Sequence, residues 1–186
     1  ENMAIIFFVL TVMIVASSWI ALGPVRKQRR QLFRYAFLSI LVGGATILAL
    51  MTQGVLAIEP WYQAQAMIPL AGMIFANSMN SVSLAAERLT AEMKRGGSYE
   101  DARTTALQSS MIPVINSLFA VGLVSLPGMM TGQILSGVSP LVAARYQIMV
   151  MCMIFGSAGI STAIFLTMTR TAFCEIYRDR AEQKSD

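Results

Sequence analysis

Long runs without a charged residue dominate this sequence, and they limit the folds that it can adopt. An α-helix rises about 1.5 Å per residue, so about 20 uncharged, mostly apolar residues cross a hydrocarbon layer about 30 Å thick. A soluble domain carries about 25% charged residues, whereas only 13% of the 186 residues here are charged and 55% are hydrophobic. The sequence therefore predicts an all-α, polytopic transmembrane helix bundle that forms a single domain over residues 1–186.

The positions of lysine and arginine decide how the longest uncharged region folds. Residues 104–169 contain a single charge, Arg145, and both flanks of the region are basic. Because basic residues of short loops stay on the cytoplasmic side, this region must leave that side and return to it. We expect its turn on the outer side, in a loop near Pro127 and Pro140. About five spans are predicted, at residues 3–22, 35–58, 60–86, 110–126 and 141–169.

The same charges predict a multi-pass protein of the cell inner membrane with a cytoplasmic C-terminus. Basic residues occur in three clusters, at residues 26–34, 88–103 and 170–184. Such clusters next to membrane spans attract anionic lipid, so the net charge of +4 predicts membrane lipid and no nucleic acid as a partner. We expect the tail, residues 170–186, to be cytoplasmic. Trp61, Tyr62 and Tyr146 are expected at the membrane interfaces.

The residue inventory argues against catalysis by this chain. It has no histidine and two cysteines, Cys152 and Cys174, so a Cys/His metal cage cannot be assembled from it. No G-x-x-x-x-G-K-[ST], G-x-S-x-G or H-E-x-x-H motif occurs. We expect no enzyme activity, no bound cofactor and no resident metal site.

The third predicted span carries the most polar stripe within the membrane. Asn77, Asn80 and Ser81 share one helical face by their spacing of three and four residues. Hydrogen bonding between helices explains such a stripe, and the lining of a translocation path is the alternative. Methionine is frequent, and its flexible side chain suits packing at a changing interface. As a metal ligand, its thioether suits copper(I) better than iron(II). The candidate path residues are Asn77, Asn80, Ser81, Asn116, Pro127, Met129 and Met130.

Small residues spaced by four predict close helix packing. Gly128-x-x-x-Gly132 and Ser157-x-x-x-Ser161 each place two small side chains on one helix face, which lets two backbones approach. Kinks or breaks are expected at the prolines within or beside the spans, because proline lacks a backbone donor. These are Pro69, Pro113 and Pro127.

Residues 87–109 form a hydrophilic segment that we expect on the cytoplasmic side. Gly96 and Gly97 predict the end of one helix. Ser98 and Asp101 form an S-x-x-D pattern, which is typical of the start of the next helix. The segment is therefore predicted to contain a turn between two helices.

Three segments resemble a known family. They are MIPLAGMIFANSMNSVSLAAERL at residues 67–89, VGLVSLPGMMTGQILSGVSPLVAARYQIMV at residues 121–150, and the hydrophilic segment between them. Together they resemble the FetB-type permeases of ABC transporters, which are similar to plant aluminium-resistance permeases and whose bacterial members are associated with iron export. Members of this family are longer, with about seven spans, so the resemblance implies that N-terminal spans precede Glu1.

The resemblance also implies partners. A permease of this class pairs with a separate cytoplasmic ATPase subunit that holds ATP and magnesium, and two permease copies form a homodimer. The turn at Gly96 and the later Pro113 resemble landmarks of the coupling helix, although the Glu-Ala-Ala portion is missing and the spacing is longer by about one turn. The implied ATPase-coupling residues are Gly96, Gly97, Ser98, Tyr99, Glu100, Asp101 and Arg103.

The expected function is thus a permease subunit that exports iron or another metal and draws its energy from a separate ATPase. Two alternatives remain open. In the first, the chain is the same kind of ABC permease, but its cargo is a nucleotide sugar or a metal chelate. In the second, the chain is a membrane scaffold that transports nothing and whose basic tail binds anionic lipid.

Overall fold

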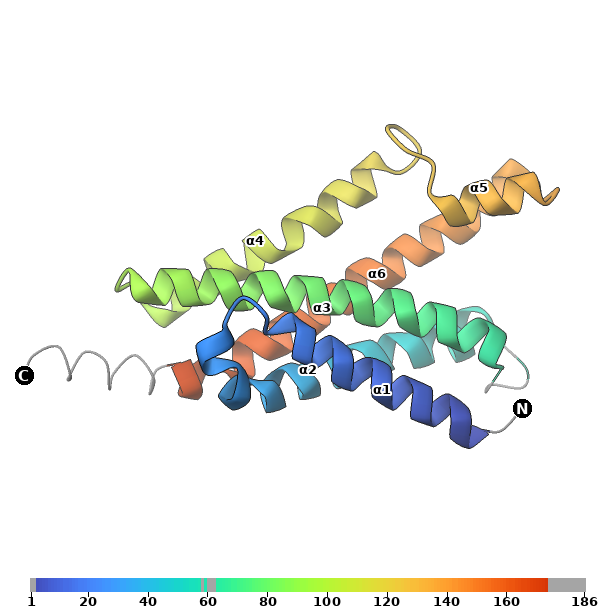
Figure 1. The fold of residues 1–186 in the computed structure, drawn as a ribbon. Coiled ribbons are helices and arrows are strands. Elements are labelled where there is room, and N and C mark those ends of the chain that lie inside the picture. Colours follow the sequence, from blue (N-terminus) through green and yellow to red (C-terminus); the bar gives the residue numbers. More distant parts are fainter. Residues whose placement is uncertain (1–2, 58, 60–62, 174–186) are drawn as a thin grey trace, which may run out of the picture.

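Helices follow the uncharged runs of the sequence in the computed structural model, which describes residues 3–57, 59 and 63–173 (Figure 1). The α-helices are α1 (Met3–Ala21), α2 (Arg29–Ala49), α3 (Ala64–Lys94), α4 (Tyr99–Ala120), α5 (Gly128–Leu135) and α6 (Pro140–Met168). Two short elements accompany them. A 3-10 turn, η1 (Arg26–Gln28), precedes α2, and a π-helical turn, η2 (Leu50–Val55), extends α2.

Three helical segments of the described residues are long and apolar enough to cross a membrane, namely Met3–Ala21, Arg26–Val55 and Pro140–Met168. They correspond to three of the spans predicted from the sequence. The helices α3 and α4 fall outside this group because amide and hydroxyl side chains lower the hydropathy of their membrane-length stretches. The protein is a polytopic helical membrane protein, and the crossings by α3 and α4 stay a prediction.

The basic segments gather at one end of the bundle. Figure 1 places the α1–α2 connection, the α3–α4 turn and the end of α6 together, and the α2–α3 connection and α5 at the opposite end. This is the arrangement that the charge pattern predicts. We call the first end the basic end. The side of the membrane that it faces stays a prediction, as do the positions of Trp61, Tyr62 and the tail beyond Phe173, which lie outside the described residues.

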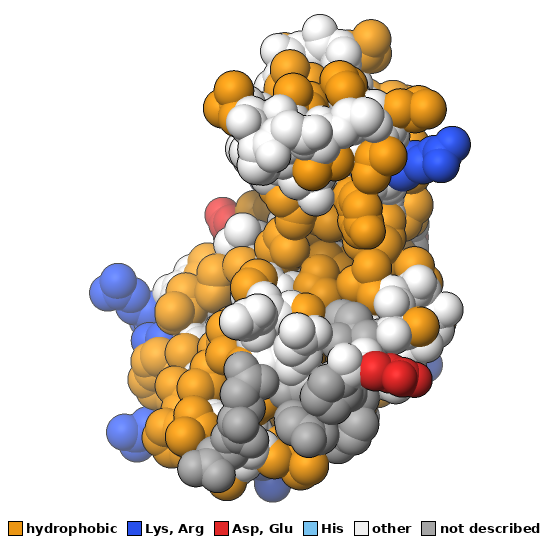
Figure 2. All heavy atoms as spheres, turned by 90° about the vertical axis from the view of Figure 1, so that its right-hand side faces the viewer, with side chains coloured by type: hydrophobic (Ala, Val, Ile, Leu, Met, Phe, Trp, Pro, Cys, Tyr) orange, Lys and Arg blue, Asp and Glu red, His pale blue; other side chains and the backbone are white. Residues whose placement is uncertain are grey.

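Apolar side chains cover much of the surface, as a lipid environment requires. Figure 2 shows this from the end that bears α5, where charged side chains are sparse. Large apolar residues are exposed on the half of α4 farther from the basic end and on the segment after it. Phe119 is 73% exposed and Leu123 86% exposed.

Small residues let α2, α3 and α6 approach closely at the centre of the bundle. A Cβ added at Gly43 would lie 2.8 Å from the backbone nitrogen of Ser161 on α6. Ser161 is fully buried, and its hydroxyl donates a hydrogen bond of 3.3 Å to the Ser78 hydroxyl on α3. Ser157 is buried on the same helix, so the predicted packing of Ser157 and Ser161 is confirmed.

Two expectations about the connection between the fourth and fifth spans are wrong. The fourth span ends as a helix at Ala120 and not at residue 126, and the connection holds the short helix α5 where a loop was expected. A Cβ added at Gly128 or Gly132 would meet nothing within 4 Å, and α5 has no buried residue. The predicted Gly128–Gly132 packing therefore does not occur between the described residues.

The prolines do not break the helices that contain them. Pro69 lies within α3 and Pro113 within α4, and both helices continue through them, so neither helix is broken there, whereas the expected kinks stay a prediction. A proline removes a single backbone donor, so the other hydrogen bonds of the helix can continue on both sides of it.

The close approach of α2 and α6 yields a stability prediction. Gly43→Ala should destabilise the folded protein by about 1–3 kcal/mol, because the added methyl group meets the α6 backbone, which can shift only if the helices separate. Thermal unfolding in detergent measures the effect. Gly132→Ala is the matched control, since open space surrounds that position. Equal stability of the two variants would contradict the close packing.

Candidate functional site: a cavity between α3, α4 and α6

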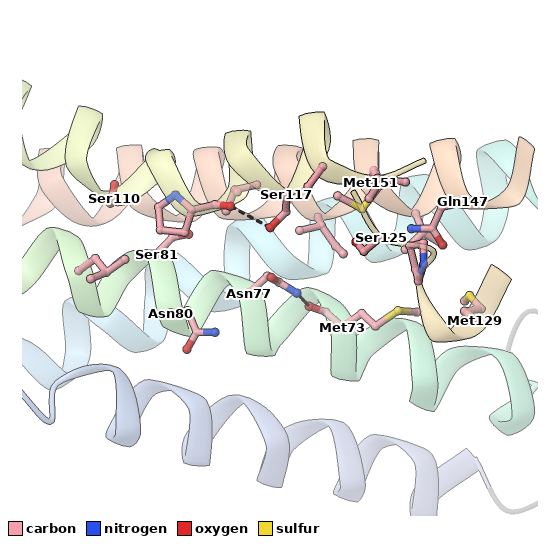
Figure 3. Close-up of a pocket in the computed structure, with 18 residues that line it drawn as sticks. Met73, Asn77, Asn80, Ser81, Ser110, Ser117, Ser125, Met129, Gln147 and Met151 are labelled. Carbon is pink, nitrogen blue, oxygen red and sulfur yellow. Dashed lines mark hydrogen bonds between the residues drawn. The ribbon is translucent and has the colours of Figure 1, made fainter. Parts of the chain in front are cut away.

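A cavity of about 500 Å³ lies between α3, α4 and α6 (Figure 3). Its lining carries no Asp, Glu, Lys or Arg and is mostly apolar, with seven amide or hydroxyl side chains and three methionines among the residues that form it. The labelled residues of Figure 3 come from α3, α4, the α4–α5 connection, α5 and α6. They are Met73, Asn77, Asn80, Ser81, Ser110, Ser117, Ser125, Met129, Gln147 and Met151.

One face of α3 forms the first wall of this cavity. Asn77, Asn80 and Ser81 recur at helical spacing, so the long helix presents all three side chains in one direction. The Asn77 amide is oriented by its hydrogen bond to the Met73 carbonyl, at 2.8 Å. Ser78 lies about 100° round the helix from Asn77, and its hydroxyl accepts a hydrogen bond from Ser161 on α6. Asn77, Asn80 and Ser81 line the cavity, and their role in a translocation path stays a prediction.

The second wall comes from α4 and α6. Ser110 and Ser117 donate hydrogen bonds to carbonyl groups of their own helix, so their oxygen atoms remain able to accept. Gln147 on α6 is only 5% exposed, and it is one of the residues that line the cavity.

The candidate path residues divide into two groups. Asn77, Asn80, Ser81, Pro127 and Met129 line the cavity, whereas Asn116 and Met130 do not. Asn116 precedes Ser117, and one residue turns a helix by about 100°, which places its side chain on another face of α4. Sequence reasoning missed Ser110, Ser117, Ser125 and Gln147. A signal existed for Gln147, because it is an isolated amide within an apolar span.

A smaller cavity continues along α3 and α4 toward the basic end. It measures about 190 Å³ and is lined by Glu87, Arg88, Ala91 and Ser109. Leu84 lines both cavities, so its side chain lies between them. The smaller cavity, nearer the basic end, is lined by charged side chains, whereas the large cavity is not.

The described residues offer no conventional metal site. No group of three or more Asp, Glu, His or Cys side chains comes together among them. The groups that face the large cavity are neutral oxygen donors and thioethers, which bind a dehydrated hard cation weakly.

The turn between α3 and α4 forms as the sequence predicted. The helix α3 ends at Lys94, and Gly96 adopts a φ of 84°, a left-handed conformation that glycine adopts without strain. Ser98 caps α4, because its hydroxyl oxygen accepts from the Asp101 backbone N–H at 3.2 Å. The same hydroxyl donates to the Asp101 carboxylate at 2.7 Å. Asp101 therefore stabilises the helix start.

The first turn of α4 is fastened to the last turns of α6. Tyr99 is buried, and its hydroxyl donates a hydrogen bond to the Leu166 carbonyl. Arg103 donates to the Thr167 hydroxyl at 3.2 Å. These contacts join residues that are far apart in the sequence, so the two helices are held together at the basic end.

An exposed carboxylate adds ion pairs to this junction. Glu100 lies 3.6 Å from the Arg103 guanidinium and 3.5 Å from that of Arg170 at the end of α6. Exposed pairs contribute little to stability. They make the outer surface of the junction a charged patch beside the α3–α4 turn.

Membrane-length apolar helices, basic connections at one end and an uncharged cavity between helices define a multi-pass helical membrane protein. The chain belongs to the uncharacterised protein family UPF0014, whose family profile matches residues 1–174. The resemblance to FetB-type permeases and to the plant aluminium-resistance proteins is confirmed by individual relatives. No solved structure matches the chain significantly.

Relatives occur in bacteria and plants. A UPF0014 membrane protein of Synechocystis is 36% identical over 93% of this chain and 73% of its own length. The probable iron export permease protein FetB of Escherichia coli is 35% identical over 76% of this chain and 59% of its own length. Protein ALUMINUM SENSITIVE 3 of Arabidopsis thaliana is 35% identical over 75% of this chain. The chain spans 54% of the length of that plant relative.

Proposed function

We propose that this chain is the membrane-spanning permease subunit of an ABC transporter, driven by a separate cytoplasmic ATPase, and that it exports iron or another metal. The observation that carries the proposal is the uncharged cavity between α3, α4 and α6, with amide and hydroxyl groups in its lining, in a relative of a probable iron export permease. Two copies of the permease would form the complex. The basic end would face the cytoplasm, in keeping with its lysine and arginine content.

The geometry supports transport by alternating access. The large cavity and the smaller one follow each other along α3 and α4, with Leu84 between them. Movement of α4 relative to α3 would displace the wall opposite Leu84 and join the two spaces. Because Tyr99 and Arg103 fasten the first turn of α4 to α6, force applied at the α3–α4 turn would tilt α4 about that junction.

The lining bears on the form of the cargo. A bare iron ion needs carboxylate or imidazole ligands, and none lines the cavity. Amides such as Asn77, Asn80 and Gln147 donate and accept hydrogen bonds, which suits water or an organic ligand around a metal. This observation favours a hydrated or chelated metal as the cargo, and it keeps a metal chelate as the second candidate.

Reconstitution tests the proposal. The protein is purified with candidate ATPases and placed in liposomes, where vanadate-sensitive ATP hydrolysis and ATP-dependent flux of iron, copper, manganese and aluminium are measured, each with and without an organic chelator. We expect association, stimulated hydrolysis and flux of at least one metal species. A scaffold would give no flux with any ATPase, and flux of a nucleotide sugar alone would replace the metal assignment.

A further inference from the structure

A separate hollow lies at the basic end, away from the large cavity. It measures about 370 Å³ and is formed by residues 23–28, which connect α1 and α2, and by Thr90 and Lys94 of the last turns of α3. The connection and the helix end are far apart in the sequence, so only the fold brings them together. This hollow has no part in the transport path described above.

Positive charge concentrates in this hollow. Arg26, Lys27 and Lys94 all line it, and its lining contains no Asp or Glu. The ion pairs among the described residues use other cations, since Glu92 pairs with Arg88 and Arg95, and Glu100 pairs with residues of the α4–α6 junction. Like charges in one concavity repel each other and attract an anion.

A buried amide marks the floor of the hollow. Gln28 is 6% exposed, and its amide oxygen has no hydrogen-bond partner among the described residues. A half-turn of the amide presents its NH₂ group, with two donors, in the same place. The hollow thus combines flexible cations at its rim with a polar group in its interior that a bound oxyanion would satisfy.

The position of the hollow matches the depth of lipid headgroups. Trp19, near the end of α1, is 46% exposed, and the Arg29 guanidinium lies 3.8 Å from the centre of its ring. Tryptophan concentrates at membrane–water interfaces, and the hollow begins at Gly23, one turn beyond it. Basic pockets at this depth bind the phosphate of anionic headgroups.

We propose that residues 23–28, Thr90 and Lys94 form a binding site for a phosphate-bearing anion, supplied either by the headgroup of an anionic lipid or by a soluble phosphate compound. The site is independent of the transport proposal. Bound anion would join the α1–α2 connection to the end of α3, next to the α3–α4 turn.

Binding is measured on the purified protein by native mass spectrometry and by thermal unfolding. One arm adds phosphatidylglycerol or cardiolipin to a zwitterionic background of phosphatidylcholine, and the other adds inorganic phosphate to the same background. The test variant is Lys27→Gln/Lys94→Gln, which removes two exposed cations of the hollow. The control is Arg30→Gln/Arg34→Gln, which removes two exposed cations of the same end that do not line it.

We expect the test variant to bind the anion at least about tenfold more weakly, which corresponds to about 1.4 kcal/mol, because it loses two cations that line the hollow, and the control to lose far less. If only anionic lipid stabilises the protein against thermal unfolding, the site is assigned to a lipid headgroup. If inorganic phosphate stabilises it as well, the site is assigned to a soluble phosphate compound. Equal losses in both variants would show diffuse surface attraction and overturn the site. Failure of either anion to bind the native protein would overturn it as well.

Discussion

Transport should fall at least about tenfold when Ser117 is replaced by tryptophan, since an added barrier of only about 1.4 kcal/mol slows a step tenfold. Ser117 is exposed on α4, and its side chain lines the cavity of about 500 Å³. An indole at this position would occupy the space between α4 and the stripe on α3. ATP-dependent flux in liposomes measures the effect, and thermal unfolding should change little because the serine is not buried.

Asn116→Trp provides the matched control. Asn116 is also exposed and precedes Ser117 on the same helix, yet it does not line the cavity. The two variants add the same side chain one residue apart, so they differ in the face of α4 that receives it. Equal flux through both variants would refute the cavity as the transport path, whether that flux is high or low.

The second large effect is expected at the α3–α4 turn. Gly97→Trp should weaken association with the ATPase at least about tenfold, which corresponds to about 1.4 kcal/mol, because a bulky side chain would occupy the tip at which we propose that the partner docks. Gly97 is exposed, and a Cβ there would lie at an ordinary contact distance of 3.7 Å from the Glu92 carbonyl. Copurification and vanadate-sensitive hydrolysis give the measurements.

Gly97→Ala separates the effect of size from the loss of glycine. It should fold normally and retain ATPase binding. This pair tests docking better than charge reversal at Asp101 or Arg103, because Asp101 supports the start of α4 and Arg103 contacts α6. Unimpaired binding by Gly97→Trp would remove the turn from the coupling interface.

Helix positions and their common basic end could be predicted from the sequence, because both depend on local quantities. Hydropathy sets the length of a span, and the charges of short connections set its direction. The break at Gly96 and the cap at Ser98 were also predictable, since each depends on the conformation of a few neighbouring residues. The helix α5 was missed because its glycines favour a loop in the absence of tertiary information.

The composition of the cavity could be predicted for α3 and, through Pro127 and Met129, for part of the connection between α4 and α6. Asn77, Asn80 and Ser81 share a helix, so periodicity places them on one face. The facing residues Ser117 and Gln147 come from other helices, and their approach depends on how α4 and α6 cross α3. The crossing of α6 and α3 depends on contacts such as the hydrogen bond between Ser161 and Ser78, which periodicity along one helix does not reveal.

The hydrogen bond between Tyr99 and Leu166 holds the first turn of α4 at the basic end, so the rest of the helix can pivot about this point. The 22 residues of α4 extend over about 33 Å. A tilt of about 10° about the Tyr99–Leu166 contact would move Ala120 by about 6 Å, roughly the pitch of one helical turn. In the transporter that we propose, a small movement applied at the basic end would therefore become a larger displacement at the far end of α4.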